Sequence, residues 1–195
     1  MNLPPVILAS ASPRRAELLR EIMPEFQVIP GHAEEFQPEQ FTPVESSMLN
    51  AWRKARVIAK RFPDALVIGA DTEVCLGLRV FGKPTDRRDA ERMLAELAGR
   101  THLVITGVCL LHLRRHQQRV FAEITRVTFQ PLDTPEIADY LDTINPLDKA
   151  GAYAIQQNGN SIVEKIEGSF SNVVGLPLER LREELTPFYT APLES

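Results

Sequence analysis

Apolar and polar positions along the chain switch repeatedly between the spacing of a strand and the spacing of a helix. Residues 6–9 and 66–70 are continuous apolar runs, which are typical of buried strands. Residues 13–22 and 86–97 instead place apolar side chains three and four positions apart, as on one face of a helix. Because strands and helices are interleaved, the pattern predicts an α/β protein with a mixed sheet flanked by helices.

The same signals predict the remaining elements. Ser12 is expected to cap the first helix, and Pro13 suits its first position. Asp71 and Thr72 are expected to end the strand over 66–70 and to lie at a sheet edge. Further strands are expected over 26–29, 102–113 and 119–129, a hairpin over 74–81, helices from 42 or 46 to 62, over 134–144 and over 178–185, and short strand-like pieces over 151–174.

Composition limits the class of protein. The chain has 195 residues, 44% of them hydrophobic, and can bury a core as one domain or as one domain with two lobes. No apolar stretch approaches the roughly 20 residues of a membrane span, and the first residues become polar too early for a signal peptide. We therefore expect a cytoplasmic protein with no membrane partner. Cys75 and Cys109 lie in apolar runs, which favours buried free thiols.

The charge balance narrows the kind of ligand. The net charge is -4 at pH 7, whereas a general nucleic-acid binder needs a broad basic surface. We therefore expect no nucleic-acid partner. Within this acidic chain, the neighbouring Arg14 and Arg15 make a local positive site. Such a site suits a small anion better than a polymer.

The turn over residues 10–15 has the chemistry of a phosphate site. Ser10 and Ser12 supply hydroxyl groups beside a helix start, and Arg14 and Arg15 add two permanent positive charges. An ordinary capped helix whose arginines face solvent would show the same pattern. The turn by itself leaves both interpretations open.

Carboxylate and ammonium groups elsewhere fit a phosphorylated substrate. Asp71 follows an apolar run, where a carboxylate is partly desolvated and can act as a base or bind a divalent cation. Lys83, in a Gly-Lys-Pro turn, could reach a phosphate. A metal-assisted site needs a second carboxylate, for which Glu34 and Glu35 in the acidic loop are candidates. The plain alternatives are a turn residue at a strand end, a surface lysine, a solvated acidic loop and, for Lys54, a solvated helix cation.

Residues 148–157, with the sequence DKAGAYAIQQ, are less easily explained as ordinary surface. The small residues predict close packing, and an amide side chain offers both a donor and an acceptor to the edge of a nucleobase. His112 and His116 are four positions apart at a strand end and its turn, a placement that does not indicate a zinc site. The sequence has no Walker loop, no Gly-x-Gly-x-x-Gly and no Gly-x-Ser-x-Gly motif.

Six short blocks in order carry a resemblance that covers nearly the whole chain. They are residues 8–15 (LASASPRR), 69–72 (GADT), 82–84 (GKP), 106–108 (TGV), 148–153 (DKAGAY) and 174–178 (VGLPL). Together they closely resemble the Maf family of nucleoside triphosphate pyrophosphatases, also called septum formation inhibitors. The resemblance implies one domain over residues 1–195, with two lobes around a central cleft, often in a homodimer. It also implies a long mixed sheet similar to that of the inosine triphosphate pyrophosphatases.

The resemblance further implies the reaction and the residues that serve it. A nucleotide would be hydrolysed between its α and β phosphates, with Mg²⁺ or Mn²⁺, to a monophosphate and pyrophosphate. Asp71 matches the catalytic base, and from the chemistry and the resemblance together we expect Glu35 and Asp71 to hold the metal ion. Arg14, Thr72 and Gln156 match positions tied to substrate choice. The polar lining of the cleft is matched by Ser10, Arg15, Glu35, Lys54 and Lys83.

Within the family, the motifs look like the branch that acts on dTTP and UTP, and a house-cleaning role would add modified pyrimidine triphosphates. The chain departs from that branch at Gln157, where the branch has a glycine. The alternatives are a 7-methyl-GTP-type pyrophosphatase, a phosphomonoesterase, and a non-catalytic nucleotide-binding regulator of cell division. The regulator would need neither Asp71 nor Glu35, so the presence of both favours the enzyme.

Overall fold

We analysed a computed structural model of the chain, which describes residues 4–33 and 41–190. Glu34 and Glu35 lie outside the described residues. By its internal contacts the chain divides into two compact units. Unit 1 is drawn from residues 1–71, 106–123 and 175–195, and unit 2 from residues 72–105 and 124–174.

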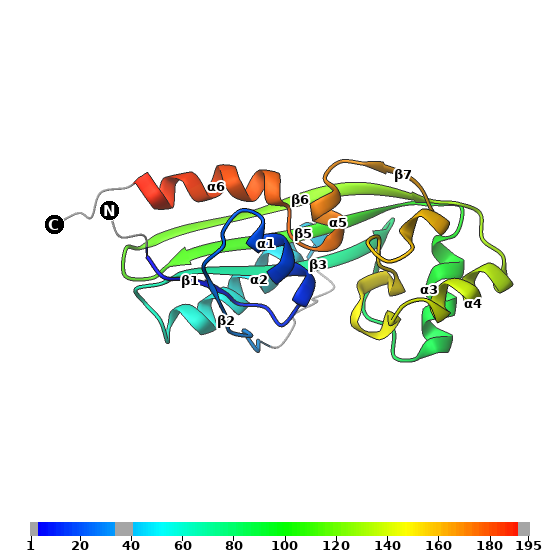
Figure 1. Cartoon of the computed structure of the whole chain (residues 1–195), viewed down its shortest axis with the longest axis horizontal. Helices are drawn as coiled ribbons and strands as arrows, with labels where there is room; N and C mark the ends of the chain where they lie inside the picture. The colour runs from blue at the N-terminus through cyan, green and yellow to red at the C-terminus, as the bar shows by residue number, and fades with distance from the viewer. Residues whose placement is uncertain (1–3, 34–40, 191–195) are drawn as a thin grey trace. The chain divides into compact units, whose positions relative to one another are not determined.

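Helices and strands are interleaved along the chain, as Figure 1 shows. The strands are β1 (Val6–Leu8), β2 (Gln27–Val28), β3 (Leu66–Leu76), β4 (Arg79–Phe81), β5 (Thr101–His112), β6 (Gln117–Phe129) and β7 (Val163–Glu167). The helices are α1 (Pro13–Arg20), α2 (Pro43–Ala59), α3 (Arg87–Leu97), α4 (Thr134–Asp142), α5 (Phe170–Val174) and α6 (Leu178–Thr190). None of the helices in the described parts of the chain is long and apolar enough to cross a membrane.

The strands of the described residues form one seven-stranded mixed sheet. Its order is β2-β1-β3-β5-β6-β7, and β4 pairs with β3. Strand β1 is parallel to both neighbours, with Leu8 beside Val28 and Ile68. Strands β4 and β7 are antiparallel to β3 and β6. These pairings confirm the predicted α/β class with a mixed sheet flanked by helices.

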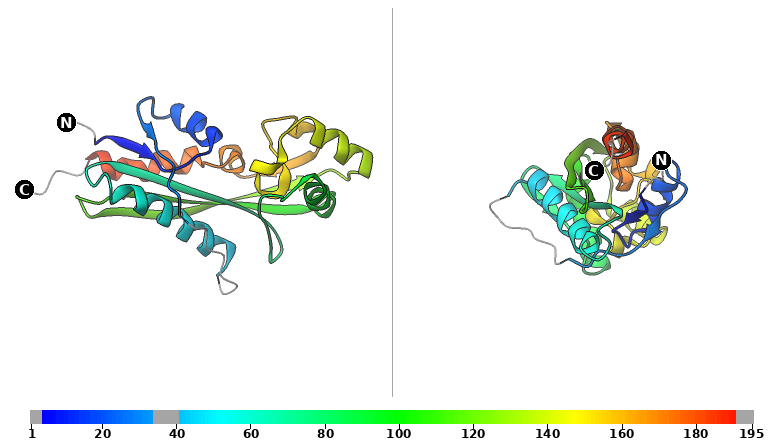
Figure 2. Two further views of the ribbon diagram at one scale, coloured as in Figure 1. Left: turned by 90° about the horizontal axis from the view of Figure 1, so that it is seen from below. Right: turned by 90° about the vertical axis from the view of Figure 1, so that its left-hand side faces the viewer.

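Helix α2 is the element of unit 1 that matters most for the candidate site. A capping box defines its start, because Thr42 Oγ1 accepts from the Glu45 N–H and the Glu45 carboxylate accepts from the Thr42 N–H. Figure 2 shows α2 on one side of the strands of unit 1 and α1 and α6 on the other. Ala51, Ala55 and Ile58 of α2 are fully buried in the core of this unit.

Two glycines let α2 lie directly on the sheet. A Cβ atom at Gly69 of β3 would be 2.2 Å from the Ala51 carbonyl oxygen. A Cβ at Gly107 of β5 would be 2.3 Å from the Ser47 carbonyl carbon. Real Cβ atoms do not approach so closely, so larger side chains at either position would push the helix away. The small residues thus set the depth at which α2 packs.

In unit 2, α3 and α4 lie side by side and pack on a core rich in aromatic rings (Figure 1). The His102 ring contacts Phe129 and Tyr153 edge-on, with centroid distances of 4.8 and 5.5 Å. The His102 Nε2 atom and the Tyr153 hydroxyl form a buried hydrogen bond of 2.9 Å. This cluster stabilises the segment that leads to Gln156.

Two expectations about elements are wrong. Strand β3 does not end at Asp71 but continues to Leu76, because Val74 and Cys75 are buried and pair with β4. Asp71 therefore lies inside a strand and not at a sheet edge. Residues 151–174 form 3-10 turns and helix α5 as well as β7, where strand-like pieces were expected throughout. Left-handed backbone at Gly151 and Ala152 interrupts extended structure there.

Candidate active site

Asp71 is a buried carboxylate held at both of its oxygens within unit 1. The residue is 8% exposed. Lys54 Nζ donates to Oδ1 at 2.6 Å, and Asn50 Nδ2 donates to Oδ2 at 3.2 Å. Lys54 and Asn50 are four positions apart on α2, a spacing that places both side chains on one helix face. One helix therefore supplies two donors to one carboxylate on the neighbouring strand.

The chemistry of this pair follows from its burial. The side chains of Lys54 and Asp71 are 14% and 11% exposed, so each charge would be costly without the other. An ionised carboxylate has about four acceptor sites, and the two hydrogen bonds do not exhaust them. Asp71 can therefore still accept from a water molecule or bind a cation. The ammonium of Lys54 adds a positive charge at the same place, which suits an anionic substrate.

The turn between β1 and α1 is organised by Ser10 and Arg15. Ser10 is 5% exposed, and its Oγ accepts from the Ser12 N–H and from Arg15 Nη1, both at 3.2 Å. Arg15 Nε donates to the Gly175 carbonyl at 2.8 Å, just before α6. Ser12 stands at the expected cap position of α1, but its side chain makes no capping hydrogen bond. Ser10, two residues earlier, closes the turn instead, because its Oγ accepts from the Ser12 N–H.

The predicted site residues are divided between the units. Unit 1 holds Ser10, Arg14, Arg15, Lys54 and Asp71, and unit 2 holds Thr72, Lys83 and Gln156. Arg14 and Thr72 are half-buried, whereas Lys83 and Gln156 are exposed. Glu35 lies outside the described residues. The structure brings Lys54 into contact with Asp71 and Ser10 into contact with Arg15.

Main-chain contacts in unit 2 join the two segments that carry its exposed site residues. The Gly151 N–H donates to the Gly82 carbonyl at 3.0 Å, beside Lys83. Further along, the Tyr140 hydroxyl accepts from the Ala154 N–H at 3.0 Å and donates to the Ala154 carbonyl at 3.2 Å. The backbone is thus anchored two residues before Gln156.

The structure accommodates a glutamine at position 157, where the family branch that the sequence resembles has a glycine. A glycine is required only where the backbone is left-handed or crowded, and Gln157 is exposed and is not among the residues with positive φ. The left-handed residue of this loop is Asn158, with φ 56°, and asparagine tolerates that conformation better than most residues. A side chain at Gln157 therefore fits without backbone strain.

Several buried polar residues were given no role from the sequence, and three of them are Asn50, Glu73 and Lys149. Asn50 is 2% exposed and contacts Asp71, while Glu73 on β3 is 3% exposed. Lys149 is 6% exposed, and its ammonium donates to the Asn145 carbonyl and to Asp148, both at 2.6 Å. The motif lysine at position 149 therefore holds its own turn together. The sequence alone carries no signal for Asn50, because its burial depends on how α2 is rotated against the sheet.

Both cysteines are buried and free, as the sequence predicts. Burial raises the pKa of the Cys75 thiol to about 12, and the nearby Glu73 charge adds to the effect. Burial alone raises the pKa of the Cys109 thiol to about 12. Thiols held in this state are poor nucleophiles and poor metal ligands. The chemistry of the molecule therefore does not lie with its cysteines.

The residues expected to bind a divalent cation, Asp71 and Glu35, would do so through carboxylate oxygen atoms. Among the described residues, no group of three His, Cys, Asp or Glu side chains could hold a metal ion. Asp71 supplies a hard oxygen ligand of the kind that Mg²⁺ and Mn²⁺ prefer, and its expected partner Glu35 lies outside the described residues. The residue types fit such a cation, and the metal site stays a prediction.

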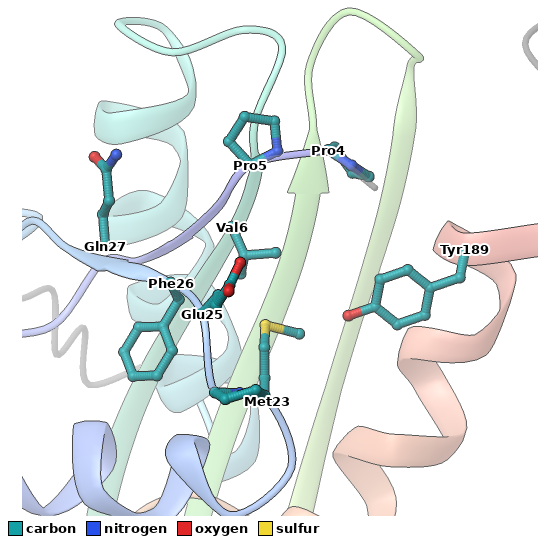
Figure 3. A pocket seen from close by; sticks show the side chains of 9 residues that line it. Pro4, Pro5, Val6, Met23, Glu25, Phe26, Gln27 and Tyr189 are labelled. Atoms are coloured by element: carbon teal, nitrogen blue, oxygen red, sulfur yellow. The ribbon is translucent and has the colours of Figure 1, made fainter. Parts of the chain in front are cut away.

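A cavity of about 670 Å³ lies elsewhere in unit 1 (Figure 3). Its lining is Pro4, Pro5, Val6, Met23, Pro24, Glu25, Phe26, Gln27 and Tyr189. The lining has a carboxylate and no lysine or arginine, so it would repel a triphosphate. The surroundings of Asp71, with their ammonium group, are the better candidate for an anionic substrate.

The fold is that of a known class of α/β proteins. The structure of the Staphylococcus aureus Ham1 protein matches with a TM-score of 0.53 at 17% identity, covering 93% of this chain and 97% of that one. A HAM1 protein from Coxiella burnetii matches with the same TM-score at 16% identity, covering 94% and 99%. At such low identity the likeness concerns the fold alone, and it confirms the fold class expected from the sequence.

Sequence comparison then identifies the family. The family described as Maf-like protein matches residues 5–188, and the chain belongs to it. A relative in Pelotomaculum thermopropionicum named dTTP/UTP pyrophosphatase is 44% identical, over 94% of this chain and 96% of its own length. Relatives of the same name in Koribacter versatilis and Thermococcus kodakarensis are 47% and 46% identical, over 90% and 89% of this chain and 90% and 92% of their own lengths.

Proposed function

We propose that the chain is a nucleoside triphosphate pyrophosphatase that hydrolyses dTTP and UTP to the monophosphate and pyrophosphate. Relatives that share 43–47% of their residues with most of this chain carry the name dTTP/UTP pyrophosphatase. The single observation in the structure that carries the proposal is the buried Asp71 carboxylate, held by Lys54 and Asn50. Such a group is suited to act as a general base in the hydrolysis of a phosphoanhydride.

In this proposal, Asp71 orients a water molecule and takes its proton as the water attacks the α phosphorus. The bond from the α phosphorus to the bridging oxygen breaks, and pyrophosphate leaves with the electron pair. The Lys54 ammonium balances the negative charge of the Asp71 carboxylate. The side chains that bind phosphate oxygens are those of Arg14, Arg15 and Lys83. Ser10 keeps the Arg15 side chain in place through its 3.2 Å contact. Catalysis then consists mainly of positioning and electrostatic stabilisation.

Substrate choice is assigned to residues that can read a base or a sugar. We propose that Gln156 pairs with the base edge through its amide and that Arg14 and Thr72 contribute to the choice of nucleotide. Gln156 is exposed on a loop whose backbone is anchored at Ala154. An exposed amide on a held backbone can meet a ligand without rearranging the core.

Glu35 and Asp71 would hold a divalent cation, Mg²⁺ or Mn²⁺. When bound, such an ion neutralises charge that develops on the phosphates. Calorimetric titration of the protein with MnCl₂ tests this site without reference to turnover. Asp71→Asn is expected to weaken Mn²⁺ binding, and unchanged binding would remove Asp71 from the ligand set.

The reaction is tested by incubating the purified protein with Mn²⁺ and each of dTTP, UTP, CTP, GTP and 7-methyl-GTP, and with p-nitrophenyl phosphate. We expect pyrophosphate and a monophosphate, with dTTP and UTP turned over fastest. Preference for 7-methyl-GTP would favour the other branch of the family. Orthophosphate alone would indicate a phosphomonoesterase, and binding without product would indicate a nucleotide-binding regulator.

Three further expectations stay predictions. They are assembly as a homodimer, a cytoplasmic location and the absence of a nucleic-acid partner. The molar mass in solution, measured by light scattering beside the chain mass of 21.9 kDa, tests the first.

A further inference from the structure

Asn50 contacts the proposed base but matches no motif that the sequence analysis singled out. Its Nδ2 atom donates to Asp71 Oδ2 at 3.2 Å, opposite the Lys54 contact to Oδ1. We propose that Asn50 is a positioning residue that orients the Asp71 carboxylate for proton abstraction, an inference that rests on the proposed function. It acts through Asp71 and does not itself touch the reacting atoms.

The first argument is the cost of an amide at this position. Asn50 is 2% exposed, and Ser46 and Ser47, one turn earlier on the same helix face, are buried as well. A buried amide without a hydrogen-bond partner is destabilising. The Asp71 carboxylate supplies such a partner to the Asn50 amide.

The second argument is geometric. The torsion that turns a carboxylate about its Cβ–Cγ bond has a broad, shallow profile, so a single bond from Lys54 to Oδ1 leaves Oδ2 able to swing. A second donor on Oδ2 limits that rotation. General base catalysis needs the accepting oxygen aligned with the proton it takes. Two donors on one rigid helix provide this alignment better than one.

The third argument distinguishes Asn50 from Lys54. The lysine ammonium carries a charge and can also contact phosphate oxygens, so its replacement changes several things at once. The asparagine amide is neutral and contributes direction without charge. The Asn50 side chain contacts Asp71 because α2 packs close to the sheet, and this close packing requires glycine at positions 69 and 107. The effect of replacing Asn50 should therefore appear in turnover and not in substrate binding.

The experiment compares Asn50→Leu, which keeps most of the volume and removes the donor, with Ser47→Ala as a matched control. Ser47 is a buried polar residue on the same helix, and its hydroxyl donates to the Val44 carbonyl. For dTTP with Mn²⁺, we expect Asn50→Leu to lower kcat roughly 10-fold to 100-fold, with KM changed less than about two-fold. Ser47→Ala should keep kcat near wild type.

A double-mutant comparison separates positioning from structural damage. If Asn50 acts through Asp71, adding Asn50→Leu to Asp71→Asn should cause no further loss of turnover. An equal loss in both backgrounds, or a wild-type kcat in Asn50→Leu, would overturn the proposal. If circular dichroism shows that the leucine variant does not fold, the same comparison with Asn50→Ala decides. Wild-type turnover in Asp71→Asn alone would instead refute the proposed base.

Discussion

At the scale of the residue, the buried Asp71 carboxylate accepts one hydrogen bond from Lys54 and one from Asn50. Asp71→Asn keeps the shape of the side chain and still offers one oxygen to the Lys54 ammonium, but it removes the base. We expect the protein to fold and kcat for dTTP to fall about 100-fold or more. Steady-state kinetics with Mn²⁺, beside a circular dichroism spectrum of the variant, measure both effects.

Two results for Asp71→Asn would contradict this prediction. Turnover within a few-fold of wild type would show that another group takes the proton. Loss of the folded spectrum would mean instead that the 2.6 Å pair is needed for stability. A matched variant is Glu164→Gln, which removes a carboxylate from an exposed position on β7. This variant should keep both the fold and the turnover.

Gln156 offers a second prediction at this scale. Gln156→Ala removes the proposed contact to the base edge and should change the ratio of dTTP to GTP turnover by about 10-fold, since a hydrogen bond that a site is built to make discriminates strongly. Gln157→Ala removes the neighbouring exposed amide and is the control. Competition assays with both nucleotides measure the ratio. If the two variants show the wild-type ratio, Gln156 does not choose the base.

Single residues differ in how far the sequence reveals them. Asp71 could be predicted because a carboxylate after an apolar run is unusual, and Lys54 could be proposed from the family resemblance. Asn50 could not be found in this way. A polar residue on a helix resembles a solvated one until the rotation of that helix about its axis is known. Only the packing of α2 on Gly69 and Gly107 reveals that Asn50 faces the sheet.

At the scale of the element, the distance between α2 and the sheet should determine whether Asn50 and Lys54 on α2 contact Asp71 on β3. In Gly69→Ala, the added Cβ would meet the Ala51 carbonyl oxygen at 2.2 Å, so the helix or the strand must shift. Overpacking of this kind costs about 1–3 kcal/mol of unfolding free energy. Urea unfolding monitored by Trp52 fluorescence measures it.

The control for this substitution is Gly82→Ala. A Cβ at Gly82 would meet nothing within 4 Å, and the residue is exposed. Its unfolding free energy should stay within about 0.5 kcal/mol of wild type, as for other surface substitutions. Equal stability of the two variants would show that α2 does not depend on a close approach at Gly69.

The elements themselves were largely predictable where the hydrophobic period is clear. The helix over 86–97 and the strand over 119–129 were expected nearly where α3 and β6 lie. The pattern failed at β3, because two polar residues in a row, Asp71 and Thr72, look like the end of a strand when the partners of Asp71 on another element are unknown. It also failed over residues 151–174, where left-handed residues and tertiary contacts override local propensity.

At the scale of the whole molecule, interleaved strands and helices were enough to predict the α/β class, whereas the division into two units was not predictable in detail. Unit 1 is assembled from three separate stretches of chain, and β3, β5 and β6 each contribute residues to both units. Hydrophobic periodicity reports which face of an element is buried. It does not report which elements share a core, since that depends on contacts distant in sequence.

At the same scale, the structure predicts that acid lowers the free energy of unfolding of the protein. His102 is 1% exposed, and its burial lowers its pKa from 6.5 to about 4. The unfolded chain therefore binds a proton at higher pH than the folded protein does. As the pH falls from about 6.5 towards 4, proton binding favours unfolding, and stability is lost over that window. Above it, this histidine makes no pH-dependent contribution.

Between pH 7 and pH 5, this linkage should lower the unfolding free energy by roughly 2 kcal/mol. Burial also lowers the pKa of His112, so the wild-type slope alone does not isolate His102. His102→Gln can still hydrogen-bond the Tyr153 hydroxyl but does not titrate in this range. Its unfolding free energy, measured in urea at both pH values, should fall by about 2 kcal/mol less than wild type. Equal losses in the two proteins would mean that the His102 ring is protonated in the folded state without penalty, and that its burial against Phe129 and Tyr153 does not control the acid limit of the fold.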